Sequence, residues 1–515
     1  MGTCSSQRRP HNKSKLDPIQ IRKRISVQSE GSYHRLVTPR KKKELDISRH
    51  NVGEVYNISS TVLGEGHYGS VYKASSKKAG DTCFAIKIVD RKDVEKNIQQ
   101  IIRELNIMRD TDHPNIVKFC ETYSSRTRFY IIMEYLEGGT LKDYVKMKGV
   151  LSEEEAKGII FQICLALNHI HDKGIAHRDF KLDNFIFKDK ERKHIKLIDF
   201  GLAKNFKKER LTSHIGTPYY APPEILKFDQ YNEKCDLWSL GVCLYKMLTG
   251  NYPFKADNLT NLFEKIKNDS FDEKVLSSFS KECRSFLKSL LVKKPKNRKN
   301  IKDIIFHPWF NEHHQKLIQN NKKSITETIF KNLKGINRVN TFGLQLLKIM
   351  ITFFSKPKDF ETSLKVFFCA DYCLNGLISS DDLQRFFNDN KENINEEELN
   401  SVMEALNIFE KDFITFSEFM VATIDRYDWI VNGDLIASLF DFLDVDNTKR
   451  VTVANLKELF TRFGYMVDAN YVREMIEFFG EDVQINGLDL DTFSRYVLNN
   501  FFNKEKDENQ FKTNA

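Results

Sequence analysis

The feature that most constrains the fold is a change of hydrophobic periodicity along the chain. Residues 56–63, 70–74 and 83–89 alternate β-branched or aromatic residues with polar ones around Gly-rich turns, which is typical of antiparallel strands. From about residue 143 to residue 310, apolar residues recur at helical spacing instead, for example in residues 156–170. This order predicts an α+β fold with a small β-rich lobe, a large helical lobe and a cleft between them.

A repeating pattern follows this region. Residues 322–360 form a junction with a strongly apolar stretch that ends at Phe354, which we expect to be a helix that buries against another element. From residue 361 to 502, each of four apolar positions follows a polar loop and precedes a helix, at intervals of 36 or 37 residues: Ile378, Ile414, Val451 and Leu488. The interval corresponds to one helix–loop–helix unit, so the sequence predicts an all-α lobe of two pairs of such units.

The composition limits the function classes. The chain has 515 residues, of which 41% are hydrophobic and 29% charged, which excludes collagen-like, disulfide-scaffold and wholly disordered proteins. Its net charge of +9 lies in residues 8–49, where 13 Lys and Arg stand against four acids, so the remaining chain sums to zero. The basic residues therefore belong to an N-terminal arm, residues 1–51, which we expect to be mostly disordered. A nucleic-acid partner is not indicated.

Targeting signals and cysteines indicate the compartment. No apolar run approaches 18 residues and the start of the chain is too basic for a secretory signal, so we expect neither a transmembrane helix nor secretion. The nine cysteines contain no C-x-x-C pair, which is typical of free thiols in a reducing compartment. We expect a monomer in the cytoplasm or at the cytoplasmic face of a membrane.

A Gly-rich segment lies at the first strand turn. Glycines allow backbone N–H groups to approach phosphate oxygens closely, although a Gly-rich hairpin without a ligand has the same appearance. The candidate phosphate-binding residues are Leu63, Gly64, Glu65, Gly66, His67, Tyr68, Gly69, Ser70 and Val71.

The residues that follow form an ordered series. Lys87 lies on the third strand, where its ammonium can hold nucleotide phosphates, and Glu104 on the next helix can pair with it. Further on stand a candidate base, a candidate phosphate clamp and two candidate Mg²⁺ ligands, in the order Asp179, Lys181, Asn184 and Asp199. Each residue alone has an ordinary structural interpretation, but the six pieces in this order predict phosphoryl transfer.

Residues 56–310 resemble a eukaryotic protein kinase domain. The resemblance implies an adenine pocket with Met133 as gatekeeper, Glu134 and Leu136 in the hinge, and Ala85 and Asp183 among the nucleotide-binding residues. It also implies a catalytic role for Thr217, a buried Asp236 that anchors the catalytic loop, and a structural ion pair between Glu224 and Arg298. Lys181 and the segment Gly216-Thr217-Pro218 point to the Ser/Thr branch, with Mg²⁺ and ATP as cofactors and proteins as substrates. A membrane-tethered scaffold with an inactive kinase fold is the alternative.

Two positions of the substrate groove depart from the pattern of relatives that select basic substrates. Those relatives often carry acids where this chain has Thr140 and Lys246, and only Asp183 keeps an acid. A strong requirement for Arg upstream of the phosphorylated residue is therefore not expected.

The kinase-like region, the junction and the four repeats together resemble a calcium-dependent protein kinase, but the calcium loops are degenerate. An EF-hand loop needs oxygen ligands at alternate positions, Gly at position 6 and Glu at position 12. The first loop, residues 371–382, has Cys373 at position 3; its candidate calcium ligands are Asp371, Asn375, Leu377 and Asp382. The loops at 407–418, 444–455 and 481–492 place apolar or cationic residues at ligand positions. Two interpretations stay open, a purely structural lobe and residual calcium sensing through the first loop.

Three further segments predict regulation. Gly2 and Cys4, followed by Ser6, fit myristoylation and palmitoylation, and the basic arm supplies a second membrane signal; a chance Met-Gly start is the alternative. Thr212 and Ser213 are candidate phosphorylation sites, or ordinary exposed residues of a basic loop. The apolar junction helix either blocks the substrate cleft, as the resembled family implies, or packs permanently into the C-terminal lobe.

Overall fold

The computed structural model describes residues 51–66, 69–78, 82–209, 211, 217–354, 357–406, 412–424, 433–463 and 467–501. The chain divides into two compact units, residues 1–46 and 47–515, and all the described residues belong to the second. Several of the predicted functional residues lie outside the described residues: Gly2, Cys4, His67, Tyr68, Thr212 and Ser213.

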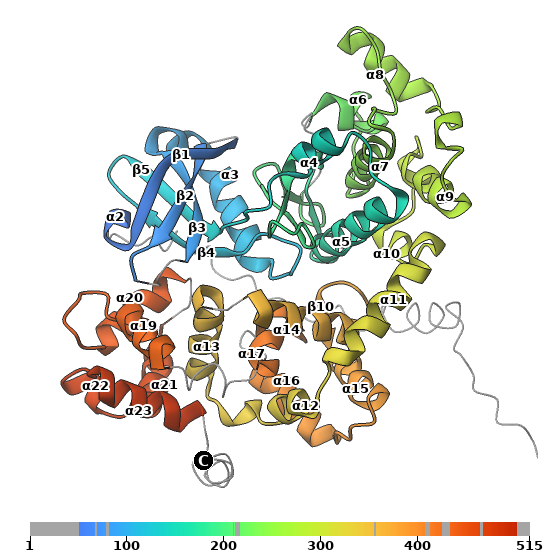
Figure 1. The fold of residues 1–515 in the computed structure, drawn as a ribbon. Helices are drawn as coiled ribbons and strands as arrows, with labels where there is room; N and C mark the ends of the chain where they lie inside the picture. Colours follow the sequence, from blue (N-terminus) through green and yellow to red (C-terminus); the bar gives the residue numbers. More distant parts are fainter. Residues whose placement is uncertain are drawn as a thin grey trace, which may run out of the picture. The chain divides into compact units, whose positions relative to one another are not determined.

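The small lobe is a five-stranded antiparallel sheet with one long helix beside it (Figure 1). The strand order is β1-β2-β3-β5-β4, and the three strands predicted from alternation are β1, β2 and β3. A short helix, α2 (Val52–Val55), precedes the sheet. The elements are β1 (Tyr56–Gly66), β2 (Gly69–Ser76), β3 (Cys83–Asp90), α3 (Arg91–Asp110), β4 (Phe119–Ser124) and β5 (Arg128–Glu134).

The large lobe is built around two buried helices, α5 and α7. Ser152 caps the start of α5 by accepting the N–H of Glu155, and the apolar periodicity of that helix buries most of its length. The helices are α4 (Leu141–Lys148), α5 (Glu153–Asp172), α6 (Pro223–Leu226), α7 (Lys234–Thr249), α8 (Leu259–Asn268), α9 (Lys281–Leu290), α10 (Ile301–Ile304) and α11 (Asn311–Asn321). Two short strand pairs flank the catalytic loop: β6 (Ile175–Ala176) with β9 (Lys204–Asn205), and β7 (Phe185–Phe187) with β8 (Ile195–Leu197). Single 3₁₀ turns lie at Leu182–Asn184, Pro218–Tyr220, Lys274–Leu276, Pro295–Asn297 and Pro308–Phe310.

The C-terminal lobe contains the helix–loop–helix units that the repeat predicts. Two of the repeat positions pair across the short sheet β10–β11, Ile378 with Ile414, and the other two form the isolated bridge between Val451 and Leu488. The elements are α12 (Glu327–Lys334), α13 (Thr341–Phe354), α14 (Pro357–Ala370), β10 (Leu377–Ser379), α15 (Ser380–Asp389), α16 (Glu396–Leu406), β11 (Phe413–Thr415), α17 (Phe416–Thr423), α19 (Gly433–Leu443), α20 (Val453–Arg462), α21 (Ala469–Phe479), α22 (Asp482–Ile485) and α23 (Leu490–Phe501). The 3₁₀ turns Lys322–Ser324 and Ile336–Arg338 precede and follow α12.

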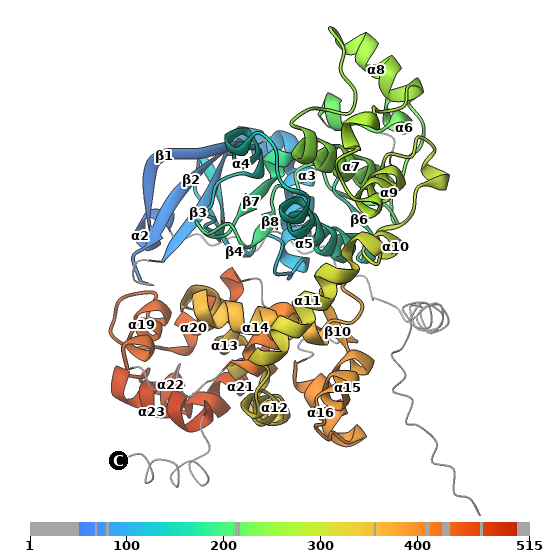
Figure 2. The same ribbon diagram turned by 45° about the vertical axis from the view of Figure 1, so that its right-hand side comes forward.

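The junction helix α13 lies inside a hydrophobic core rather than at the substrate groove. Its residue Phe342 packs against aromatic rings of α20 and α21, and in Figure 2 α13 lies among the helices of the C-terminal lobe. At its other end, the ring of Phe353 lies 5.3 Å from that of Phe84 on β3. One cluster of buried apolar side chains thus runs from the small-lobe sheet through α13 into the repeats. Of the two predicted arrangements of this helix, the structure has the packed one.

The structure shows the expected fold class, a bilobal α+β kinase fold followed by a helical lobe of paired units. In the part of the chain that the structure describes, no helix has both the length and the apolar character needed to span a bilayer.

Candidate active site

Three side chains converge on one carboxylate of the catalytic loop. Asp179 follows strand β6 and is 5% exposed. Its Oδ2 accepts a hydrogen bond from Lys181 Nζ at 2.6 Å and from Asn184 Nδ2 at 3.2 Å. Its Oδ1 accepts one from Thr217 Oγ1 at 3.3 Å. Four of the predicted residues therefore converge, although 38 residues separate Thr217 from Asp179.

A buried carboxylate at the start of α7 holds this loop. Asp236 accepts the backbone N–H groups of His177 and Arg178, at 2.9 and 2.8 Å, and the Nε2 of His171 lies 2.9 Å away. Burial alone would raise the pKa of Asp236, but the bond from His171 and these donors hold the pKa below its usual value. The left-handed φ of 69° at Arg178 is fixed by the same contacts.

An ion pair links the sheet to helix α3. Lys87 Nζ on β3 lies 2.6 Å from Glu104 Oε1 on α3, and both side chains are almost completely buried. A Cβ on Gly66 would lie 3.4 Å from Lys87 Cε, so the Gly-rich turn passes directly over this lysine. The predicted pair is present, and it points an oriented ammonium toward the space beneath the turn.

The second candidate metal ligand lies after strand β8. Asp199 has a φ of 63°, and its Oδ1 accepts the N–H of Gly201 at 3.1 Å. Phe200 is buried against His177 of the catalytic loop, with ring centroids 5.4 Å apart. Asn184 donates its amide N–H groups to Asp179, which leaves the amide oxygen of Asn184 for a cation. A carboxylate and an amide oxygen fit Mg²⁺, with phosphate oxygens completing the coordination.

The predicted adenine end lies on paired strands. Ala85 of β3 is the register partner of Met133 of β5, and Leu63 and Val71 lie on β1 and β2. The carboxylate of Glu134 accepts from Lys196 Nζ at 2.6 Å and from the Lys118 N–H at 2.7 Å. Burial works to raise the pKa of Glu134, but Lys196 and Lys188 outweigh it and hold that pKa below its usual range. Any nucleotide contact by Glu134 must therefore come from its backbone.

Comparisons with known proteins agree with this geometry. Residues 57–310 match the family model described as the protein kinase domain. The chain is 32% identical to calcium-dependent protein kinase 5 of Plasmodium falciparum over 87% of this chain and 78% of that protein. It is 31% identical to calcium-dependent protein kinase 3 of Plasmodium berghei over 83% of this chain and 77% of that protein.

The chain belongs to the calcium-dependent protein kinase family. It is a protein serine/threonine kinase, and the family implies use of ATP and Mg²⁺ and protein substrates. A meiosis-specific serine/threonine-protein kinase of Schizosaccharomyces pombe is also similar, at 34% identity over 53% of this chain and 63% of that protein.

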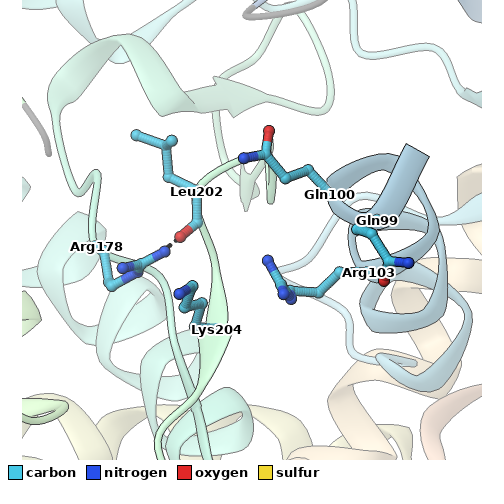
Figure 3. Close-up of a pocket in the computed structure, with 7 residues that line it drawn as sticks. Gln99, Gln100, Arg103, Arg178, Leu202 and Lys204 are labelled. Atoms are coloured by element: carbon cyan, nitrogen blue, oxygen red, sulfur yellow. Dashed lines mark hydrogen bonds between the residues drawn. The ribbon is translucent and has the colours of Figure 1, made fainter. Parts of the chain in front are cut away.

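A basic cavity of about 310 Å³ lies between helix α3 and the activation segment of this kinase (Figure 3). Arg103, Arg178 and Lys204 line it, and Arg178 Nε donates to the carbonyl of Leu202 at 2.7 Å. The carboxylate of Glu209 pairs with two of these cations: its Oε2 lies 3.6 Å from Arg103 Nη2 and 3.5 Å from Lys204 Nζ. The sequence does not indicate the contact between Arg103 and Glu209, because that contact depends on how α3 packs.

The first loop of the C-terminal lobe has the hydrogen bonds of an EF-hand turn but a weak set of ligands. The carboxylate of Asp371 accepts the N–H groups of Gly376 and Asn375, at 2.7 and 3.2 Å, and Asp382 caps helix α15 through Ser379. Burial raises the pKa of Asp371 to about 8, and burial also raises the pKa of Asp382. Across the described residues, no group of three or more His, Cys, Asp or Glu converges to hold a metal ion. The residues present therefore fit a tightly bound calcium ion poorly.

The same loop contacts the kinase lobe. Asn168 on α5 donates to the carbonyl of Leu374 at 2.8 Å, and His169 Nδ1 lies 2.8 Å from the carbonyl of Asn375. A Cβ on Gly376 would meet His113 at 2.1 Å, so only glycine permits this approach. No pattern in the sequence predicts these contacts.

The other loops also differ from calcium sites. In the third loop, Asp444 accepts the N–H of Lys449, and Lys78 of the small lobe donates to the carbonyl of Asp444. The fourth segment, residues 481–492, contains the short helix α22. In the second loop, residues 407–411 lie outside the described residues, and the position-12 carboxylate, Glu418, lies 3.6 Å from Lys348 Nζ.

Proposed function

We propose that Asp179 is the residue that orients the hydroxyl of a substrate Ser or Thr for phosphorylation. The convergence of Lys181, Asn184 and Thr217 on this one buried carboxylate supports the assignment. Lys181 neutralises charge that develops on the transferred group, and Thr217 fixes the carboxylate next to the acceptor. ATP with Mg²⁺ supplies the phosphoryl group.

The nucleotide is held by residues of both lobes. Lys87, oriented by Glu104, binds phosphate oxygens, and Asn184 and Asp199 offer oxygens to Mg²⁺. The Gly-rich turn covers the phosphates with its backbone N–H groups. Ala85, Met133 and the hinge from Glu134 to Leu136 enclose the adenine, and the proposed set also includes Leu63, Gly64, Glu65, Gly66, His67, Tyr68, Gly69, Ser70, Val71 and Asp183.

Two substitutions test these roles. Asp179→Asn should reduce kcat by at least about 10³-fold while ATP·Mg²⁺ still raises the melting temperature, because nucleotide binding does not need that carboxylate. Asp199→Ala should abolish both transfer and the Mg²⁺-dependent part of the melting shift. Equal phosphorylation by wild type and Asp199→Ala would instead favour the inactive scaffold.

We also propose that the C-terminal lobe regulates this kinase with little or no need for calcium. The supporting contacts surround Asp112, in the connection after α3. Its carboxylate accepts the hydroxyls of Ser417 and Thr415, at 2.7 and 2.8 Å, and Lys348 Nζ of α13 lies 3.6 Å away. Burial works to raise the pKa of Asp112, but Lys348, Lys118 and these hydroxyls hold it far below the usual value.

Lys348 thereby supplies a fixed cation next to Glu418, the position-12 carboxylate of the second loop. Its ammonium lies between Asp112 of the kinase lobe and Glu418 of the second loop. We expect kinase activity in calcium and in chelator to differ by less than about twofold. A large calcium stimulation that Asp371→Ala abolishes would show that the first loop still senses calcium.

We further propose that phosphorylation of the activation segment at Thr212 or Ser213 regulates the kinase. Among the described residues at the cavity, the cations Arg103, Arg178 and Lys204 outnumber the acid Glu209, which favours binding of a phosphate, and we propose that Thr212 or Ser213 carries it. Alternatively, Glu209 alone already tethers Arg103 and Lys204. Full activity of Thr212→Ala and Ser213→Ala variants would support this alternative.

We propose a location at the cytoplasmic face of a membrane, through acylation of Gly2 and Cys4 and the basic arm. The support is the sequence pattern alone, since one myristoyl chain needs a second signal and 13 basic residues supply it. Wild type expressed in eukaryotic cells should float with membranes and Gly2→Ala should not. Light scattering of the purified chain tests the expected monomer.

A further inference from the structure

Positive charges gather beside Asp183, four residues after the proposed catalytic Asp179. Lys142 Nζ on α4 donates to Asp183 Oδ1 at 2.6 Å, so the acid that this groove keeps is already paired. Thr140, at the position where relatives that select basic substrates often have an acid, caps α4 and donates its hydroxyl to Asp143 at 2.6 Å. Little unpaired negative charge is left here to receive a substrate arginine.

Lys246, in the last turn of α7, adds a cation to this groove. Its Nζ lies 4.0 Å above the ring of Tyr252. Partial burial lowers the pKa of Lys246, and Lys255 and Lys142 lower it further. Among the described residues, none places a carboxylate within ion-pair distance of Lys246. Lys246 is thus a partly buried ammonium over the ring of Tyr252 whose charge is disfavoured by those of Lys255 and Lys142.

The tyrosines under Lys246 connect it to the acceptor site. The ring of Tyr252 stacks on Tyr219 with centroids 4.4 Å apart. Tyr219 follows Thr217 by two residues, and Thr217 donates to Asp179 at 3.3 Å. The lysines therefore border the groove in which a substrate peptide has to lie when its hydroxyl reaches Asp179.

We propose that Lys246, Lys142 and Lys255 bind an anionic side chain of the protein substrate, upstream of the residue that is phosphorylated. The anion is a carboxylate or a phosphoester, since either can accept from several ammonium groups. It relieves the repulsion among the three lysines, whereas an arginine adds to it. This inference deepens the proposed function, because it rests on Asp179 being the acceptor site.

A positional scanning library tests the preference with the full-length kinase. Each peptide pool has one central Ser or Thr and one fixed residue between positions −5 and +4. We expect Asp and Glu at −3 or −2 to be selected about threefold or more over Ala, and Arg to be selected less than Ala, since one exposed ion pair changes binding by up to about fivefold. Stronger selection of phosphoserine than of Glu identifies primed substrates; weaker selection identifies acidic ones.

Charge reversal assigns the effect to the site. Lys246→Glu should lower the ratio of Glu to Arg selection at that position by about tenfold. Lys457→Glu, on the exposed face of α20, makes the same change in net charge and should leave the ratio as in wild type. Lys142→Ala provides a second variant, because it frees Asp183 and should also lower the ratio.

The possible results distinguish a failure of the proposed anion site from a failure of the proposed phosphoryl transfer at Asp179. Arg selected over Ala and Glu by wild type, or ratios unchanged in both Lys246→Glu and Lys142→Ala, refutes the anion site while leaving phosphoryl transfer intact. Phosphorylation of no pool refutes the proposed transfer at Asp179, and this inference with it.

Discussion

Replacing Lys348 by methionine removes the ammonium between the kinase lobe and the second loop while keeping an unbranched apolar side chain of the length of the lysine stem. The ammonium lies 3.6 Å from Asp112 and 3.6 Å from Glu418, and its side chain is 17% exposed. At an effective dielectric constant of about 20, each attraction amounts to roughly 4–5 kcal/mol before desolvation. Desolvation cancels most of this, and Lys118 still compensates part of the charge on Asp112, so we expect a net loss of about 2–3 kcal/mol.

The assay compares Lys348→Met with Lys365→Met. Lys365 forms an exposed pair with Glu361 on α14, at 2.8 Å, whose loss should cost at most about 1 kcal/mol. In the presence of chelator, Lys348→Met should melt a few degrees lower. Amide exchange should also be faster around residues 111–118 and 413–418. Identical melting and exchange in the two variants would refute the idea that Lys348 holds the lobe in place.

Four further perturbations test other contacts of the structure. Gly376→Ala puts a Cβ 2.1 Å from His113 at a φ of +72°, so we expect faster amide exchange in residues 371–379 without loss of Mg²⁺·ATP binding. Glu209→Gln should lower kcat/KM several-fold in phosphatase-treated protein, and an unchanged value would show that its pairs with Arg103 and Lys204 are unimportant. Truncation after Asn320 should give aggregation rather than higher activity, because it exposes the core that α13 fills; a soluble, activated fragment would contradict this. Acidification below about pH 4 should loosen the C-terminal lobe, because the pKa of Asp112 is lower in the folded protein than in the unfolded chain. The ionised Asp112 therefore stabilises the fold above the pKa of the unfolded chain, and this stabilisation is lost as the pH falls toward the pKa of the folded protein.

The kinase site was predictable from sequence because its residues recur in a fixed order. Lys87 lies within strand β3, which the alternation marks, whereas Asp179, Asn184 and Asp199 lie in loops or turns next to short strands. The pairing of Ile378 with Ile414 was likewise readable from the 36-residue interval. Local sequence patterns predict such elements because each strand, turn or helix is built from residues that are close together in the sequence.

The contacts of Asp112 and Lys348 between the kinase lobe and the C-terminal lobe were not predictable in this way. Asp112 and Ser417 are 305 residues apart, and nothing in either segment alone distinguishes them from exposed polar residues. The small number of acids in these loops is visible in the sequence, but the absence of a ligand residue does not indicate what the remaining carboxylates contact. Lys348 looked like the single charge on an apolar helix, and only the packing of α13 places it between two carboxylates.

The position of these contacts ties the C-terminal lobe to catalysis. Asp112 and His113 follow directly after α3, the helix that carries Glu104. The C-terminal lobe contacts that connection through Thr415, Ser417 and the turn at Gly376. These contacts restrict movement of the C-terminal end of α3 away from the sheet. An α3 that is fixed there keeps Glu104 within 2.6 Å of Lys87, and hence keeps the phosphate-binding ammonium oriented. We therefore propose that packing and direct ion pairs hold α3 in position on this chain without calcium.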